Sequence, residues 1–284
     1  MFKFEANEMY QMPVHFGPAC GPRRGPDGRR FCWNGPQDSL QHSLVYETNP
    51  NAIEAFLPQG FSLRQPYVIV THKMHRNLPW LAGRGYNVVT FNTPVFCQGK
   101  EERVLGQYQL AIWESHADPI LSGREQLGYA KVFADIEDMR SFHSIARASL
   151  SSWGFRFLEL QIDKSSEPGD LALLQSVLLD PESEGLLHYK YIPRTGDSFC
   201  EADVAYVTIS PRKDSLPEGL PPLPPPERSW CSGNLTWHIP TWEDMPTQYH
   251  IVQGLASLPV LRVLGGSVVK LQHYGDVYGQ RRVR

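Results

Sequence analysis

Short runs of β-branched and aromatic residues follow one another along the chain, a pattern typical of β-strands that bury one face. It predicts strands at residues 42–48, 66–72, 86–91, 106–113, 155–162, 187–192 and 202–210. Residues 260–271 are predicted to form a pair of strands around Gly265 and Gly266. Strands therefore make up most of the predicted structure.

Predicted helices are few. Asn49 and Pro50 provide an N-cap and a proline at the first helical position, which predicts a short helix over residues 52–57. Asp118 before Pro119 predicts a helical turn to about residue 127, and further helices are predicted at residues 170–179 and 247–258. Residues 136–150 leave helix and strand open, because their apolar residues have helical spacing but the serine-rich sequence disfavours a helix.

The order of these elements predicts the fold class. Many strands, few helices and no regular alternation between them indicate a mainly antiparallel α+β fold. Residues 1–40, rich in glycine, proline and arginine, are predicted to form an irregular N-terminal arm, and residues 41–284 a single domain. Seven prolines between residues 211 and 227 indicate an extended surface connection.

Composition narrows the classes of function. The chain has 284 residues, of which 41% are hydrophobic and 20% charged, so it can bury a sizeable core. A net charge of −3 argues against a general nucleic-acid binder, and no apolar run approaches the ~20 residues of a membrane helix. The N-terminus lacks the apolar core of a secretory signal, and the five cysteines include no Cys-x-x-Cys pair. A cytoplasmic protein without disulfides or a zinc site is expected.

One of the eight lysines, Lys131, lies in an apolar segment directly after a glycine. In an alternating strand its side chain shares a face with Tyr129 and Phe133. Burial can lower the pKa of a lysine from ~10.4 by roughly 3–5 units, and the neutral amine can then attack a ketone. The alternative is a lysine whose stem lies on apolar surface while its ammonium reaches water.

Two histidines and a tyrosine are further candidates. The His-x-x-His spacing of His72 and His75 is compatible with a metal site, but no third ligand is evident, so we predict no metal and consider proton transfer or ordinary polar contacts. Tyr86 precedes an expected strand and can either hydrogen-bond a substrate oxygen or fill the core. Trp80, Trp113 and Trp153 could line an apolar pocket or pack in the core.

Arginines cluster in the N-terminal arm. Arg29, together with Arg23, Arg24 and Arg30, lies among glycines and prolines. The loop is either a solvated surface segment or a mobile lid that presents a guanidinium to an acidic substrate.

The segment from Gly123 to Lys131 resembles the active-site signature of the acetoacetate decarboxylase family, G-R-E-x-x-x-Y-P-K. Five of the six defined positions match, and Ala130 replaces the proline. The resemblance implies that Lys131 forms a Schiff base with a carbonyl substrate without a cofactor. It also implies substrate contact by Tyr129, and supporting roles for Arg124 and Glu125, which we expect to brace the site by pairing. The fold would be a closed, mainly antiparallel β-cone with flanking helices, assembled as a homo-oligomer.

The sequence also departs from that family. The residue after the reactive lysine is Val132 rather than a second lysine, and simple register places Thr71 and Val88 where the family has two glutamates. The family's substrate-binding arginine would fall near Ser39. The simplest hypothesis is a lyase that decarboxylates a β-keto acid. The alternatives are an aldolase, dehydratase or cyclase of secondary metabolism that uses the same imine, and a ligand-binding relative without catalysis.

Overall fold

The computed structural model describes residues 2–22, 24–25, 28, 35–196, 200–212, 220–274 and 279–284. Its strands are β1 (Gln37–Glu47), β2 (Phe61–Leu63), β3 (Tyr67–Leu78), β4 (Arg84–Gln98), β5 (Arg103–Glu114), β6 (Lys131–Phe133), β7 (Asp135–Ile136), β8 (Arg140–Phe142), β9 (Ile145–Ser152), β10 (Phe155–Asp163), β11 (Gly185–Pro193), β12 (Ala202–Pro211), β13 (Glu227–Trp237), β14 (Arg262–His273) and β15 (Arg281–Arg282). The helices are α1 (Pro50–Glu54), α2 (Ala117–Ser122), α3 (Leu171–Leu178) and α4 (Tyr249–Ala256), with short 3-10 helices η1 (Val14–Phe16) and η2 (Pro79–Leu81) and a π-helical turn, η3 (Gly123–Leu127).

The described strands form one large mixed sheet. Its order is β15-β12-β11-β5-β4-β3-β1-β14-β13-β10-β9-β7, with β2 beside β4, β6 beside β5 and β8 beside β9. Most neighbours are antiparallel, but β5 runs parallel to both β11 and β6. The predicted closed cone is therefore corrected to an open, mixed sheet that ends at β15 and β7. β6 can run parallel to β5 because the chain crosses back through α2 and η3 before it pairs.

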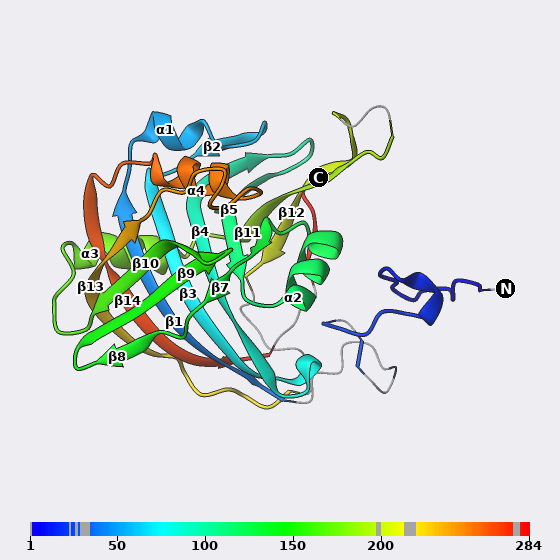
Figure 1. Ribbon diagram of the computed structural model, residues 1–284, viewed down its shortest axis with the longest axis horizontal. Coiled ribbons are helices and arrows are strands. Elements are labelled where there is room, and N and C mark those ends of the chain that lie inside the picture. Colours follow the sequence, from blue (N-terminus) through cyan, green and yellow to red (C-terminus); the bar gives the residue numbers. More distant parts are fainter. Residues whose placement is uncertain are drawn as a thin grey trace.

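A change of partner along β13 joins the two parts of this sheet. Residues 227–231 pair with β14, and residues 232–237 pair with β10. The largest core cluster includes Phe91 of β4, Trp113 of β5 and Phe157 of β10, together with Val252 and Leu255 of α4. Figure 1 shows α4 at the ends of β4 and β5, while α2 and α3 lie on opposite sides of the molecule. This packing fixes β4 and β5, which contribute to the site described below.

The structure resolves one segment that the sequence left open and differs from the sequence predictions in others. Residues 136–150, which were open between helix and strand, contribute to β7, β8 and β9. β14 is one continuous strand through Gly265 and not the predicted pair of strands. A Cβ on Gly265 would lie 2.6 Å from a Pro168 side-chain atom, so this glycine permits close packing instead of making a turn. β13 was not predicted.

A buried histidine, His42, is expected to make the stability of the fold depend on pH. His42 is 1% exposed, and its Nδ1 has no hydrogen-bond partner among the described residues. Burial, followed by the nearby His72 and Lys164, lowers the pKa of His42 from 6.5 to about 4. Between pH 6.5 and pH 4, His42 is protonated in the unfolded chain but neutral in the folded protein. The free energy of unfolding therefore falls as the pH falls through this range.

Above pH 6.5 we expect the titration of His42 to leave the free energy of unfolding unchanged. Between pH 6.5 and pH 4 we expect protonation of His42 in the unfolded chain to lower that free energy by about 3 kcal/mol. Urea denaturation at pH 7 and at pH 4.5 measures the change. In His42→Gln the loss of stability over this interval should be smaller. An equal loss in both proteins would contradict the assignment.

Candidate active site

A cavity of about 250 Å³ lies beside the ends of β1, β3, β4 and β14, against α2, η3 and β6. The residues that line it include His75, Trp80, Tyr86, Tyr129, Lys131 and His273. A larger hollow of about 600 Å³ lies elsewhere, around Leu40 and Met74, and Lys131 does not line it. The smaller cavity is the candidate site because it combines a buried amine with several groups that can exchange protons.

The segment between β5 and β6 places Lys131 at this cavity. The turn η3 ends at Gly128, which adopts a left-handed conformation with φ 81°, and the chain then enters β6 with Lys131 paired to Ile112. The Arg124 guanidinium donates a hydrogen bond to the Lys131 carbonyl at 2.8 Å. Lys131 is 8% exposed, and its Nζ donates to the Pro119 carbonyl at 2.9 Å.

Glu114, the last residue of β5, is the acidic partner of this amine. Its Oε1 lies 2.9 Å from the Lys131 Nζ, and its side chain is almost fully buried. Burial raises the pKa of Glu114, while Lys131 and Lys73 oppose that rise. Its Oε2 has no hydrogen-bond partner among the described residues. A carboxylate in this setting can accept a proton from the lysine beside it.

Lys73 of β3 supplies a second cation on the same side of the sheet. Lys73 pairs with Val88 of β4, and Val88 pairs with Glu114 of β5. Burial lowers the pKa of Lys73, Glu114 raises it, and Lys131 lowers it. No hydrogen bond or ion pair links Lys73 to another described residue. The sequence could have indicated Lys73. It stands two residues after Thr71, where the family resemblance implies a glutamate near the amine, and residues two apart on a strand share a face.

The chain is similar to known proteins over most of its length. The family model described as acetoacetate decarboxylase matches residues 11–277. The chain belongs to the acetoacetate decarboxylase family. Among curated protein sequences no match is found.

Several solved structures share the fold. An acetoacetate decarboxylase from Legionella pneumophila subsp. pneumophila is similar with a TM-score of 0.60 and 17% identity over 88% of each chain. An acetoacetate decarboxylase-like enzyme from Sphingomonas wittichii RW1 has a TM-score of 0.61 and 12% identity over 88% of this chain and 92% of that one. The enduracididine biosynthesis enzyme MppR, complexed with pyruvate, has a TM-score of 0.57 and 17% identity over 91% and 94%. At these identities the likeness shows the fold alone.

The positions where the family resemblance implies two glutamates and a substrate-binding arginine carry uncharged residues here. Thr71 and Val88 are buried, and the Thr71 hydroxyl is 3.0 Å from the Ser43 hydroxyl. Ser39 is also buried, and its hydroxyl accepts a hydrogen bond from the Gln41 amide at 3.2 Å. Glu114 is therefore the carboxylate that contacts Lys131, and the sequence prediction did not single it out in that role.

Two predicted substrate-binding tyrosines line the cavity. The ring of Tyr129 lies 4.9 Å from the Lys131 Nζ, and its hydroxyl contacts the Ser210 hydroxyl at 2.8 Å. Burial, followed by Glu114 and Tyr129, raises the pKa of Tyr86 well above its usual value. Tyr86 therefore stays protonated at neutral pH and can donate a hydrogen bond to a ligand oxygen.

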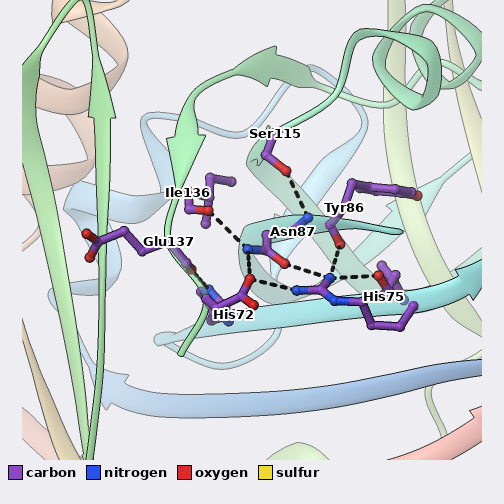
Figure 2. Close-up of polar contacts among 9 residues, drawn as sticks. His72, His75, Tyr86, Asn87, Ser115, Ile136 and Glu137 are labelled. Atoms are coloured by element: carbon purple, nitrogen blue, oxygen red, sulfur yellow. Dashed lines mark hydrogen bonds and ion pairs between the residues drawn. The ribbon is translucent and has the colours of Figure 1, made fainter. Parts of the chain in front are cut away.

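Other predicted residues lie elsewhere. His72 occupies the opposite face of β3, where its Nε2 is 2.8 Å from the Glu137 carbonyl, so it does not line the cavity (Figure 2). Residues three apart on a strand point to opposite faces, which is why His75 and not His72 reaches the site. Arg29 lies outside the described residues. Arg124 and Glu125 form no ion pair with each other, and the Glu125 carbonyl instead accepts a hydrogen bond from Lys190.

The four aromatic residues considered from the sequence have different surroundings in the structure. Trp80 lines the cavity, whereas Trp113 is fully buried in the core and Trp153 is 79% exposed. Phe133 is 47% exposed and does not share the environment of Lys131.

None of the helices in the described parts of the chain is long and apolar enough to span a membrane. In the same residues no cluster of three or more histidine, cysteine or acidic side chains could hold a metal ion.

Proposed function

We propose that this protein is a lyase that forms a Schiff base between Lys131 and the carbonyl group of an oxo acid. The observation that carries the proposal is the buried contact of 2.9 Å between the Lys131 Nζ and the Glu114 Oε1 at the wall of a cavity. Glu114 accepts a proton from the ammonium, and the free amine attacks the carbonyl carbon. Loss of water then gives an iminium that accepts the electron pair of a neighbouring bond.

The charges around the cavity support an anionic substrate. Lys73, which does not itself line the cavity, and Lys131 are two cations against one carboxylate, Glu114, so the charge beside the cavity is net positive. A substrate carboxylate placed toward Lys73 would offset this charge while the carbonyl carbon meets Lys131. Decarboxylation of a β-keto acid is the simplest reaction of such a complex, because the iminium accepts the electrons that the departing CO₂ leaves behind.

Carbon–carbon bond formation or loss of water is the second candidate reaction. It is favoured by the uncharged residues Thr71 and Val88 at the positions where the family resemblance implies glutamates. Cytoplasmic location, a homo-oligomeric assembly and the domain boundary near residue 40 stay predictions.

Borohydride trapping tests the proposal. The protein is incubated separately with acetoacetate and with pyruvate, reduced, digested and analysed by mass spectrometry. We expect the mass of a reduced imine on the peptide that contains Lys131, and CO₂ release measured in parallel separates decarboxylation from the second candidate. Absence of an adduct with both acids would favour a ligand-binding protein without catalysis.

Gly123 gives an independent test of where the amine must lie. A Cβ at this position would lie 2.6–2.7 Å from the Lys131 Cδ, Cε and Nζ. Because only the flexible end of the lysine has to move, Gly123→Ala should fold but hold the amine away from its present position. We expect imine formation with pyruvate to slow by about a hundredfold, since misplacement of about 1 Å has effects of this size.

The matched control is Gly35→Ala, because a Cβ on Gly35 meets no atom of the described residues within 4 Å. This variant should trap as much imine as the unmodified protein. Equal trapping in Gly123→Ala would show that the observed position of the amine is not required.

A further inference from the structure

His75 is a described side chain of the cavity to which the proposed Schiff base assigns no role. It stands on β3 two residues after Lys73, opposite Tyr86 of β4 in the strand pairing. Its ring centroid lies 5.5 Å from that of Tyr86 and 5.7 Å from that of His273 of β14. All three side chains line the cavity that contains Lys131.

The backbone around His75 is held in place by Arg76. Its Nη1 donates to the His75 carbonyl at 2.8 Å and to the Tyr86 carbonyl at 3.4 Å, and also to the Asn87 amide oxygen at 3.0 Å. Asn87 and Arg76 both donate to the Asp138 carboxylate, and Figure 2 shows this network of polar contacts around Asn87. The guanidinium therefore fixes the strand positions from which His75 and Tyr86 enter the cavity.

The other ionisable groups at the cavity are already engaged or unsuited to accept a proton. Lys131 is the proposed nucleophile, and Glu114 is paired with it. Tyr86 stays protonated because burial raises its pKa, and the Tyr129 hydroxyl contacts Ser210 and the Gln280 amide.

Of the ionisable groups that line the cavity, His75 and His273 remain, and their surroundings differ. Burial, followed by Lys73, lowers the pKa of His273, while the backbone of Tyr274 and the charge of Asp38 oppose that shift. Neither ring nitrogen of His75 is hydrogen-bonded to a described residue, and its Nδ1 is buried without a partner. Burial, followed by His273, Lys73, Lys131 and Arg76, lowers the pKa of His75 well below its usual value. The ring is therefore neutral at physiological pH and has one nitrogen free to accept a proton.

We propose that His75 is a catalytic base that removes a proton from the carbon next to the Lys131 iminium and so converts it to an enamine. This inference rests on the proposed Schiff base. The C–H bond breaks, its proton goes to the His75 imidazole, and its electron pair forms the C=C bond of the enamine while the C=N⁺ electrons return to the Lys131 nitrogen. A substrate carboxylate toward Lys73 offsets the positive charge that this step places on His75.

A base at His75 restricts the substrate class further than Schiff-base formation at Lys131 alone. The substrate is an oxo acid with at least one hydrogen on a carbon next to its carbonyl group. Its enamine can take a new proton from the imidazolium, attack a carbonyl compound, or expel a leaving group. A neutral His75 in the cavity thus supports the second candidate reaction, carbon–carbon bond formation or loss of water.

Hydrogen–deuterium exchange of pyruvate tests this step. Loss of the methyl signal in D₂O is followed by proton NMR, and the rate is divided by the fraction of Lys131 that borohydride traps as imine. We expect measurable exchange with the unmodified protein. In His75→Gln the rate per trapped imine should fall by about a hundredfold, the size of a general-base contribution.

His72→Gln is the matched control, because His72 lies on the same strand but faces away from the cavity. Its exchange per trapped imine should equal that of the unmodified protein. Division by the trapped fraction removes any loss of folded protein, so a merely structural role of His75 would leave the ratio unchanged. An unchanged ratio in His75→Gln, or imine without exchange in the unmodified protein, would overturn the role of His75 but leave the Schiff base standing. Absence of imine in the unmodified protein would overturn the proposed function itself.

Discussion

Replacing Lys131 with methionine is expected to abolish borohydride trapping and to lower turnover at least about a thousandfold, because the nucleophile is lost and no parallel route to the iminium remains. Methionine matches the length of the lysine stem and suits a site that is 8% exposed, so the fold should persist. Without the ammonium, burial raises the pKa of Glu114 unopposed by its nearest cation, and the carboxyl group stays protonated. The protein then avoids holding an unpaired buried charge.

The measurements are trapping by mass spectrometry, turnover with acetoacetate and the urea denaturation midpoint. Lys270→Met serves as the control, because the side chain of Lys270 is 73% exposed on β14. It should retain trapping and turnover. An adduct that moves to Lys73 in the Lys131→Met protein would instead identify Lys73 as the reacting amine.

Glu114→Gln should have the second largest effect. Glutamine fills the same space but cannot take the proton from the Lys131 ammonium, so imine formation should slow by about a hundredfold. The change also leaves the ammonium buried without a counter-ion, with only uncharged oxygens such as the Pro119 carbonyl to accept its hydrogen bonds. Removing one partner of a buried ion pair costs about 3 kcal/mol or more, so the urea midpoint should fall clearly.

Glu114→Asp separates the two effects. The shorter carboxylate keeps a proton acceptor near Lys131 while its contact with the amine lengthens. We expect imine formation to recover in part relative to Glu114→Gln, even if stability does not. Similar rates in the two variants would show that proton acceptance by this side chain does not limit the reaction.

The sequence by itself determined the local features of this protein. Runs of β-branched and aromatic residues predicted most of the long strands but not β13, and Asn49 with Pro50 predicted α1, where the Asn49 side chain does cap the helix. The match from Gly123 to Lys131 identified the family, which the family model confirms. These predictions succeeded because the information lies within a few consecutive residues: a cap, a period of two and a motif need no knowledge of the rest of the chain.

Only the tertiary structure decided which distant groups meet. Glu114 contacts Lys131 because β6 runs parallel to β5, and Lys73 faces the same side because its strand pairs in a particular register with β4. His72 and His75 could not be distinguished until the face of β3 toward the cavity was known. The open, mixed sheet likewise depends on the crossover through α2 and the change of partner along β13. Strand register and sheet closure are set by contacts between segments far apart in sequence, so neither periodicity nor a motif can specify them.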